Sequence, residues 1–502
     1  MKNFPITDKV TGKEYWISRS MAAAIVVVTD DGKFIAERRG PGCPDNVGKL
    51  VFPCGYLDFD ESLEECAKRE VYEELGLKVT ELHFLGLNDD PSANRQNITA
   101  RYAAKVEGKP DTNSLARGGE KDEVAEVLIM DIDEILEKPE EWAFGHAKLA
   151  EYVNEHMTEI FDEPESHAFL RRLLATPSLS GYEGDASCEF LKYVGEEKGQ
   201  TDFFNNAWVE KGEGHLKVLI EAHIDQIGLQ VQLVTDDGYL HVDRVGGIDK
   251  KVLPGTKVWV LTEDKKIPGV IGKKPIHCEE SAERGKVADL ETLLVDVGAS
   301  SKKEVEDLGI GCGTLVSFEL KPDLAFGPKK DKILSPGLDD KIGVYIVSQV
   351  FKEVNNPEIT LVAGATAQEE TGLRGSGVLA KRVEPDLSIS LDVTFCAVEG
   401  VKKEDVGDVV LGKGPVIMHG SDKSPRIAKA LKEVAKTHGI PYQEAVSGPR
   451  GTNTTNIQES SRNCETYLIS IPNKNMHTQV EICDWNDVEN TIKLLTEFLK
   501  TL

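Results

Sequence analysis

The N-terminal part of the chain alternates short apolar runs with turn residues. The run 22–29 is almost continuously apolar, and Asp31-Gly32 separates it from residues 33–37, which predicts a buried strand in a hairpin. The same pattern predicts further strands at 82–87, 98–106 and 125–130, and helices at 132–137 and 146–156. Together these elements fit one mixed α+β domain of roughly 150 residues.

A different periodicity marks residues 55–77, which read GYLDFDESLEECAKREVYEELGL. Apolar side chains recur at roughly helical spacing, which predicts an amphipathic helix with its apolar stripe at Leu63, Cys66, Ala67, Val71 and Leu75. Asp60 is the expected N-cap of this helix, and Gly76 is expected to end it as a C′ glycine.

The pattern changes after the acidic, proline-containing segment 161–164, which we take as a domain boundary. Helices are predicted at 166–175 and in a second amphipathic stretch ending near Glu196. Short buried strands follow at 218–221, 359–364 and 387–391, as in an α/β domain. Between them, residues 238–324 are rich in glycine and β-forming residues, which indicates a small β-barrel-like domain inserted into the α/β domain.

Composition narrows the class of protein. A chain of 502 residues is too long for one hydrophobic core, so two or more domains are expected. Its 59 Lys and Arg against 86 Asp and Glu give a net charge of −27, which argues against nonspecific nucleic-acid binding and anionic membrane surfaces. The apolar run 21–28 is too short to span a bilayer, and no signal peptide is evident. Nine cysteines spread singly along the chain suggest a reduced, cytoplasmic protein.

Charge also changes the interpretation of the helix within 55–77. Glu70, Glu73 and Glu74 stand at i, i+3 and i+4 and therefore share one helix face. Like charges at that spacing repel each other, whereas a divalent cation such as Mg²⁺ would stabilise them and still keep waters and phosphates as ligands. The stretch therefore predicts a metal site for phosphate chemistry.

The spacing of Gly55, Glu61 and the segment 69–77 resembles the Nudix hydrolase signature at every defined position. The resemblance implies an α/β/α sandwich that hydrolyses a nucleoside diphosphate linked to another moiety. It also implies that Gly55, Glu70, Glu73 and Glu74 form a site for Mg²⁺ or Mn²⁺, that Glu73 is catalytic, and that Arg69 orients a carboxylate of the cluster.

Weaker signals bear on the nucleotide substrate. The segment 88–92 resembles Nudix members that act on ADP-ribose-like compounds, although Asp-Pro-Ser is also an ordinary turn. Glu120 and Glu123 are candidates for a further acid of the metal site, or else strand-edge charges. Arg38 and Arg39 are candidates for phosphate contacts, and a surface role is about as plausible.

A second set of metal-type residues lies in the C-terminal part of the chain, where predicted strands end. Ligand sites in α/β proteins lie at the carboxyl ends of strands, and two histidines with three acids are a workable set for two Zn²⁺ or Co²⁺ ions bridged by a carboxylate. The residues concerned are His223, Asp225, Asp339, Glu369, Glu370, Asp392 and His477. Four other histidines are interpreted as ordinary core or surface residues: His215, His241, His277 and His419.

From about residue 166 to the C-terminus, these segments resemble the tetrahedral-assembling (TET) dinuclear metallo-aminopeptidases, which include glutamyl and leucyl aminopeptidases. The motifs GIDKKVLPGTKV, GVIGKKPIH, DVGASSKKEVEDLGI and LDDKIG follow in order. The resemblance implies that one metal is held by His223 and Asp392, the other by Glu370 and His477, and that Asp339 bridges them. It also implies that Asp225 orients His223 and that Glu369 is the general base. The substrates implied are peptides with free N-termini.

Three positions depart from that family's usual residues. The chain has Gln226 in place of Glu, the segment 451–454 (GTNT) in place of Gly-Thr-Asp-Ala, and 474–475 (KN) in place of Arg-Tyr. None is an expected metal ligand, so the departures bear on substrate preference. The resemblance also implies large homo-oligomers, commonly dodecamers, assembled through the inserted β domain.

The expected division is a Nudix domain at 1–160, a metallo-aminopeptidase domain at 165–235 and 325–502, and an assembly domain at 236–324. The first functional hypothesis is a bifunctional hydrolase with both activities. The second is an aminopeptidase regulated by a nucleotide-sensing Nudix domain, and the complete signature argues against it. The third is a peptidase domain that acts only as a scaffold, against which the full metal-ligand set argues.

Overall fold

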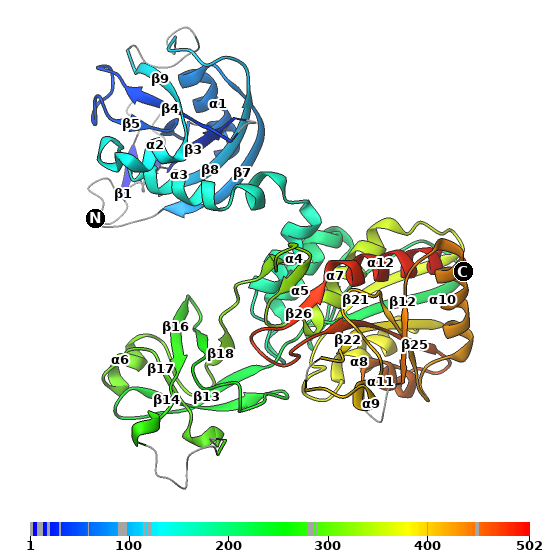
Figure 1. Ribbon diagram of the computed structural model, residues 1–502. Helices are drawn as coiled ribbons and strands as arrows, with labels where there is room; N and C mark the ends of the chain where they lie inside the picture. Colours follow the sequence, from blue (N-terminus) through cyan, green and yellow to red (C-terminus); the bar gives the residue numbers. More distant parts are fainter. Residues whose placement is uncertain are drawn as a thin grey trace. The chain divides into compact units, whose positions relative to one another are not determined.

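The computed structural model in Figure 1 describes the chain except for residues 1–3, 8–13, 18–20, 30–31, 59, 89–97, 114–116, 118–121, 279–285, 288, 399 and 447–450. The chain forms two compact units, Met1–Pro164 and Glu165–Leu502. Each hydrophobic core is built from residues of a single unit.

The first unit contains a seven-stranded sheet in which β5, β4, β3, β8 and β7 follow one another, while β6 pairs with β3 and β9 with β4. The strands are β3 (Met21–Val28), β4 (Phe34–Arg39), β5 (Leu50–Val51), β6 (Cys54–Tyr56), β7 (Lys78–Asn88), β8 (Ile98–Glu107) and β9 (Val124–Met130). A separate two-stranded sheet joins β1 (Phe4–Thr7) to β2 (Glu14–Ile17).

Helices cover both faces of this sheet. Alternate residues of β3 point to opposite sides. Ala23, Ile25 and Val27 pack in one core cluster with α1 (Leu63–Leu75), whereas Val26 and Val28 pack in another with α2 (Ile132–Glu137) and α3 (His146–Glu155). Burial on both sides explains why β3 is apolar at every position. The predicted α/β/α sandwich is confirmed.

The helix expected within 55–77 is α1, but its N-cap is not Asp60. The Ser62 hydroxyl accepts a hydrogen bond from the Glu65 amide, and the Glu65 carboxylate accepts one from the Ser62 amide, which completes a capping box. Asp60 lies outside the helix with a φ of 68°. Gly76 ends the helix in the left-handed region with a φ of 72°, as expected.

The other predicted elements of the first unit are present with shifted ends. The expected hairpin is the antiparallel pair β3 and β4, in which Val28 is paired with Phe34. The predicted strand 82–87 is the eleven-residue β7, and the predicted helix 132–137 coincides with α2. Asp31 of the turn lies outside the described residues.

The second unit is built on an eight-stranded sheet with the order β10, β11, β21, β12, β22, β25, β23, β24. Its strands are β10 (Gln200–Thr201), β11 (Ala207–Lys211), β12 (Leu216–His223), β21 (Ile359–Thr366), β22 (Leu387–Phe395), β23 (Val416–His419), β24 (Gln443–Val446) and β25 (Glu465–Asn473). The four central strands β21, β12, β22 and β25 are parallel.

Two groups of helices pack on this sheet. The larger core cluster joins it to α4 (Glu165–Ala175), α5 (Gly184–Val194), α7 (Leu338–Glu353), α10 (Pro425–His438) and α12 (Trp485–Leu499). A smaller cluster joins it to α8 (Arg374–Val383) and α11 (Asn453–Ser460). Short α9 spans Lys403–Val406. Successive β12 residues belong to different clusters, Val218 to the larger and Leu219 to the smaller, as expected for a sheet covered on both faces.

Between β12 and α7 the chain forms a closed six-stranded barrel (Figure 1), followed by two strands of a small three-stranded sheet whose third strand comes from near the C-terminus. The barrel contains β13 (Gly228–Val234), β14 (Tyr239–Val245), β15 (Lys257–Leu261), β16 (Lys266–Ile271), β17 (Leu294–Asp296) and β18 (Leu315–Phe318), with α6 (Lys302–Asp307) between the last two strands. The small sheet pairs β19 (Asp323–Phe326), β20 (Lys332–Leu334) and β26 (Ile482–Asp484). The predicted β-barrel-like insertion is therefore confirmed.

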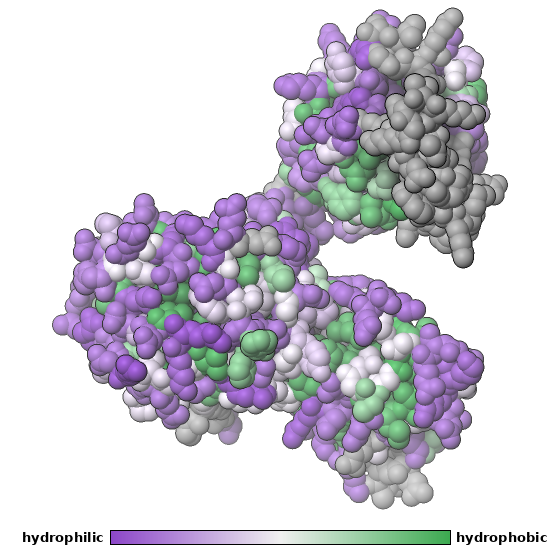
Figure 2. All heavy atoms as spheres, turned by 180° about the vertical axis from the view of Figure 1, so that it is seen from behind, coloured by the Kyte–Doolittle hydropathy of each residue, from purple (hydrophilic) through white to green (hydrophobic). Residues whose placement is uncertain are grey.

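Hydrophilic residues predominate on the face of the molecule in Figure 2, in keeping with the high charged content of the sequence. Among the described residues, no helix is both long and apolar enough to cross a membrane.

The separate cores lead to the first prediction. A chain consisting of residues 165–502 is expected to fold alone, because its core clusters contain no residue from the first unit. Circular dichroism should show a cooperative thermal transition. The full chain, measured in parallel, should show this transition and a second one from residues 1–164. An aggregated 165–502 fragment, or one without a cooperative transition, would contradict the prediction.

Candidate metal centres

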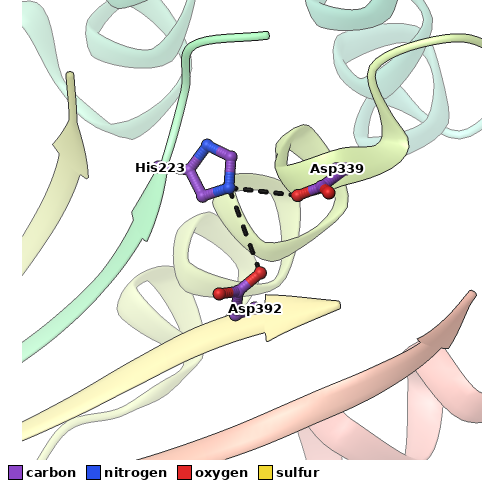
Figure 3. Close-up of side chains that lie close together, drawn as sticks. All are labelled: His223, Asp339 and Asp392. Atoms are coloured by element: carbon purple, nitrogen blue, oxygen red, sulfur yellow. Dashed lines mark hydrogen bonds and ion pairs between the residues drawn. The ribbon is translucent and has the colours of Figure 1, made fainter. Parts of the chain in front are cut away.

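The fold gathers five of the expected ligands of the second unit from elements far apart in the sequence. His223 is the last residue of β12, Asp339 lies at the start of α7, and Asp392 lies within β22. Glu370 follows β21, and His477 follows β25. Because β12, β21, β22 and β25 run parallel, their carboxyl ends lie at one edge of the sheet. In Figure 3 the side chains of His223, Asp339 and Asp392 converge on one point.

Asp339 is the centre of this arrangement. Its Oδ1 lies 3.1 Å from Nε2 of His223, and its Oδ2 lies 3.2 Å from Nε2 of His477. Asp392 Oδ1 lies 4.0 Å from His223 Nε2, and Glu370 Oε1 lies 3.3 Å from His477 Nε2. Two groups of three donors result, each with its ligand atoms within 4.8 Å of one another, and Asp339 belongs to both.

These separations suit metal ions of the zinc class. Zn²⁺ binds histidine nitrogen and carboxylate oxygen at ~2.0–2.2 Å, so neighbouring donors of a tetrahedral site lie ~3.3–3.6 Å apart. The three distances from His223 and His477 to Asp339 and Glu370 lie at or slightly below that range, and Asp392 lies slightly above it. The donor set therefore fits two ions that share one carboxylate.

The electrostatics of the site reflect carboxylates crowded in a buried place. Burial, followed by the neighbouring Asp339, raises the pKa of Asp392 to about 7. Burial also raises the pKa of Glu369 well above its usual value. For His477, burial opposes the charged form, but hydrogen bonds to Asp339 and Glu370 outweigh burial and raise the pKa to about 12. The raised pKa values of the acids and of the imidazole have one cause, which is an excess of negative charge in a buried place.

Asp225 is fully buried and connects several parts of the site. Its carboxylate accepts hydrogen bonds from the backbone amides of Glu369 (2.9 Å) and Glu370 (3.2 Å) and from the Ser180 hydroxyl. His223 Nδ1 lies 3.1 Å from the Asp225 carbonyl oxygen and 3.5 Å from its Oδ1. One residue thus positions both the expected metal-binding imidazole and the loop that carries the expected base.

Glu481 has a comparable position and was missed in the sequence. It is buried, and its two carboxylate oxygens accept hydrogen bonds from the backbone amides of Asp339 (2.9 Å) and His477 (3.0 Å). Glu481 therefore fixes the backbone of two expected ligands. Glu481 directly precedes β26 and belongs to no periodic pattern in the sequence. The one sequence feature that could have pointed to it is its position four residues after His477.

Residues at all three unusual positions form hydrogen bonds with residues other than the expected metal ligands. Gln226 Oε1 accepts a hydrogen bond (2.6 Å) from the fully buried ammonium group of Lys341, which also donates to the Thr176 carbonyl. Burial lowers the pKa of Lys341 to about 7. Asn453 donates hydrogen bonds to Glu221 and to Thr366 at the end of β21. Lys474 pairs through its backbone with Ile482.

In the first unit, Arg69 joins the carboxylates of the signature. It forms ion pairs with Glu61 (2.7 Å), Glu70 (2.7 Å) and Glu73 (3.0 Å). Arg69 therefore contacts two of the three glutamates expected to bind metal. Among the described residues, the groups of three donors within 4.8 Å of one another both lie in the second unit, so the signature glutamates do not form such a group.

Gly55 packs closely against the Glu70 carboxylate. A Cβ atom at Gly55 would lie 2.0 Å from Oε1 of Glu70, so a larger residue there would displace the end of that side chain. Glu74 is buried beside the same strand, and its Oε2 accepts a hydrogen bond from the Cys54 amide (3.0 Å). Burial raises the pKa of Glu70 to about 7 and that of Glu74 well above its usual value.

The expected substrate contacts lie in different environments. Arg38 pairs with Glu126 (3.1 Å), and Arg39 is buried and pairs with Asp45 (3.3 Å). Glu123 is partly buried, and its carbonyl oxygen accepts a hydrogen bond from the Gly40 amide. Glu120 and most of the segment 88–92 lie outside the described residues.

Comparisons with known proteins agree with this geometry. Residues 205–494 match the family model of M42 glutamyl aminopeptidases, and residues 19–153 match that of the NUDIX domain. A lysyl aminopeptidase of Pyrococcus furiosus is 35% identical over 341 residues, which span 66% of this chain and 96% of the relative.

Two solved structures are similar to the second unit. A TET aminopeptidase from a marine-sediment Thaumarchaeota archaeon has 26% identity and a TM-score of 0.64, covering 67% of this chain and 96% of its own. The Pyrococcus horikoshii TET1 peptidase has 31% identity and a TM-score of 0.60, covering 67% of this chain and its own full length. The chain therefore belongs to the M42 glutamyl aminopeptidase family and carries a NUDIX domain ahead of the peptidase region.

Proposed function

We propose that this protein is a bifunctional hydrolase in which a dinuclear aminopeptidase is joined to an active Nudix pyrophosphohydrolase. The peptidase assignment rests on one observation above all, the position of Asp339 between His223 and His477 with one oxygen facing each. We assign His223 and Asp392 to one Zn²⁺ or Co²⁺ ion, Glu370 and His477 to the other, and Asp339 to both.

Two such ions, when bound, lower the pKa of a coordinated water and polarise the scissile carbonyl. Glu369 takes the proton from the attacking water and returns it to the leaving amine. Asp225 holds this base in place through the Glu369 amide, and the same carboxylate holds the Glu370 amide. A free α-amine bound at the centre would confine cleavage to the first peptide bond, so the substrates are peptides with free N-termini.

We infer that the N-terminal domain hydrolyses a nucleoside diphosphate derivative, such as an ADP-ribose-like compound, with Mg²⁺ or Mn²⁺. The complete set Glu70, Glu73 and Glu74 supports catalysis, with Glu73 in a catalytic role. Arg69 contacts Glu70 and Glu73 and would orient them. The alternative is a domain that binds nucleotide without turnover and regulates the peptidase.

We also propose that the protein forms homo-oligomers through the inserted barrel. The barrel runs from Gly228 to Phe318, so its first strand begins ahead of the expected assembly domain at 236–324. The Pyrococcus horikoshii relative is described as assembling into a tetrahedron or a large octahedral shell. Nine unpaired cysteines support a cytoplasmic setting.

The role of Glu369 leads to a second prediction. Glu369→Gln keeps the size of the side chain but removes the base, so aminopeptidase kcat should fall by about 10³-fold while metal content stays unchanged. Turnover should be measured on aminoacyl chromogenic substrates that include lysyl and glutamyl forms. Glu358→Gln is the matched control, because this exposed glutamate precedes the same strand, β21. Unchanged turnover in Glu369→Gln would refute the assignment.

The shared carboxylate leads to a third prediction. Asp339→Asn removes the charge that two ions would share, so zinc content should fall from about two ions per chain to below one. Inductively coupled plasma mass spectrometry on the purified protein measures this directly. Asp340→Asn would be a poor control because it is buried nearby; exposed Asp386→Asn serves instead. A content of two ions in Asp339→Asn would contradict the bridging role.

A fourth prediction concerns the N-terminal domain. Glu73→Gln with Glu74→Gln should abolish hydrolysis of nucleoside diphosphate derivatives in Mg²⁺ or Mn²⁺ and leave aminopeptidase turnover unchanged, because the two sites use different residues. Product formation and nucleotide-induced thermal shifts should be followed in parallel. A stabilising nucleotide without products in the wild-type protein would favour the sensor alternative over the catalytic one.

A further inference from the structure

The loop 367–370, which carries the expected base and one expected metal ligand, is held by its backbone. It directly follows strand β21, and its four successive amides each donate a hydrogen bond to a side chain from another part of the chain. The first amide donates to Oδ1 of Asn206 (2.9 Å) and the second to Oε1 of Glu183 (3.1 Å). The last two donate to the Asp225 carboxylate. These acceptors therefore fix the conformation of the loop.

Glu183 is fully buried, and both of its carboxylate oxygens have donors. Oε1 accepts hydrogen bonds from the amides of Gly181 (2.6 Å) and Gln368 (3.1 Å), and Oε2 accepts one from Nδ2 of Asn205 (3.0 Å). Glu183 is also the N-cap residue of α5, a position at which a polar side chain commonly accepts a bond from its own helix. The described helix has no such capping bond, so the carboxylate serves the loop 367–370 instead.

The residue that Glu183 holds has an unusual backbone conformation. Gln368 has a φ of 58°, in the left-handed region that residues other than glycine rarely adopt. A strained conformation of this kind persists only where surrounding contacts hold it, and the bond from the Gln368 amide to Glu183 is one such contact. Because Gln368 directly precedes Glu369, its backbone angles set the direction in which the Glu369 side chain leaves the loop.

The alternative is that Glu183 only shapes its own turn, since one of its bonds is to Gly181, two residues earlier. Two observations favour a role at the peptidase site. The other amide bonded to Oε1 belongs to Gln368, 185 positions later in the chain. The same turn also presents Ser180, whose hydroxyl donates to the Asp225 carboxylate. The turn therefore contacts both the loop 367–370 and the acid that supports that loop.

We propose that Glu183 is a positioning residue for the peptidase reaction: by holding the Gln368 amide, it directs the Glu369 carboxylate towards the attacking water. The proposal rests on the assignment of Glu369 as the base under the proposed function, and it deepens that function. Glu183 acts through its neighbour in the loop. Loss of its bond should therefore lower kcat and leave the metal ions in place, since no expected ligand is changed.

The first test compares aminopeptidase kcat, KM and zinc content among variants of the full chain. Glu183→Met keeps the length of the side chain but has no acceptor, so kcat should fall by about 10-fold or more with KM and zinc content unchanged. Glu183→Gln keeps one oxygen for the two amides, so kcat should stay within about 3-fold of the wild-type value. Glu183→Asp, which draws the acceptor back from Gln368, should lower kcat as Glu183→Met does and replaces that variant if it does not fold. A wild-type kcat in the folded Met or Asp variant would refute the proposal.

A double-mutant cycle tests whether Glu183 acts through the base. Glu183→Met should lower kcat in the wild-type background and have no further effect in Glu369→Gln, where no base remains to be positioned. The same fall in both backgrounds would mean that Glu183 affects turnover independently of Glu369, and the proposal would be wrong.

Asp487→Leu is the matched control. Asp487 is also fully buried, and its carboxylate accepts the backbone amides of Gly412 (2.7 Å) and Gly414 (2.6 Å). Its loss should lower the unfolding temperature, as the loss of Glu183 should, but leave kcat per folded chain unchanged. An equal fall in kcat in Asp487→Leu and Glu183→Met would show a general effect of losing a buried acid and contradict the positioning role.

The single variant Glu369→Gln separates this inference from the proposed function. If Glu369→Gln keeps wild-type turnover, the assignment of the base is itself wrong. If Glu369→Gln loses turnover while Glu183→Met keeps it, only the role of Glu183 is refuted.

Discussion

Buried negative charge has to be compensated in a folded protein, because a carboxylate removed from water loses several kcal/mol of hydration unless hydrogen bonds or cations replace it. In the peptidase region, Asp339, Glu370 and Asp392 face the imidazole rings of His223 and His477. Burial opposes the charged form of both histidines, but hydrogen bonds to the neighbouring carboxylates outweigh burial and raise their pKa. Two divalent ions bound by the same side chains would take the place of protons on the imidazoles and supply more positive charge.

The layer around these ligands shows how loops are made rigid enough for such a site. Asp225 and Glu481 are both buried, and each accepts two backbone amides of residues in the site. Charge-assisted hydrogen bonds of this kind are stronger than neutral ones, and they fix backbone rather than side-chain positions. The supporting residues are themselves acids, so they add to the charge that the bound ions must balance. The same buried carboxylates therefore fix the backbone of the site and increase the negative charge that the metal ions would balance.

The sequence predicted most of this architecture where the signal was local. The expected ligands His223 and Asp339 lie at the end of a strand and the start of a helix. Helix α1 was predicted from the helical spacing of its apolar residues. Its cap was misplaced because Asp60 and Ser62 are both good N-caps, and the decisive partner is Glu65, three residues after Ser62. Glu481 could not be found this way. Its carboxylate accepts a hydrogen bond from the amide of Asp339, which lies 142 positions earlier in the chain.

The two proposed centres differ in donor chemistry, and this difference bears on why they can share one chain. The peptidase set mixes imidazole nitrogen with carboxylate oxygen, which favours Zn²⁺ or Co²⁺, whereas the N-terminal set offers carboxylates alone, which suits Mg²⁺ or Mn²⁺. Zn²⁺ generally binds a given site more tightly than Mn²⁺, so a carboxylate site would depend on its ligand type and on metal availability to hold Mg²⁺ or Mn²⁺. Under these assignments the two activities depend on different metal ions. A shortage of zinc would then stop peptide hydrolysis but not nucleotide hydrolysis.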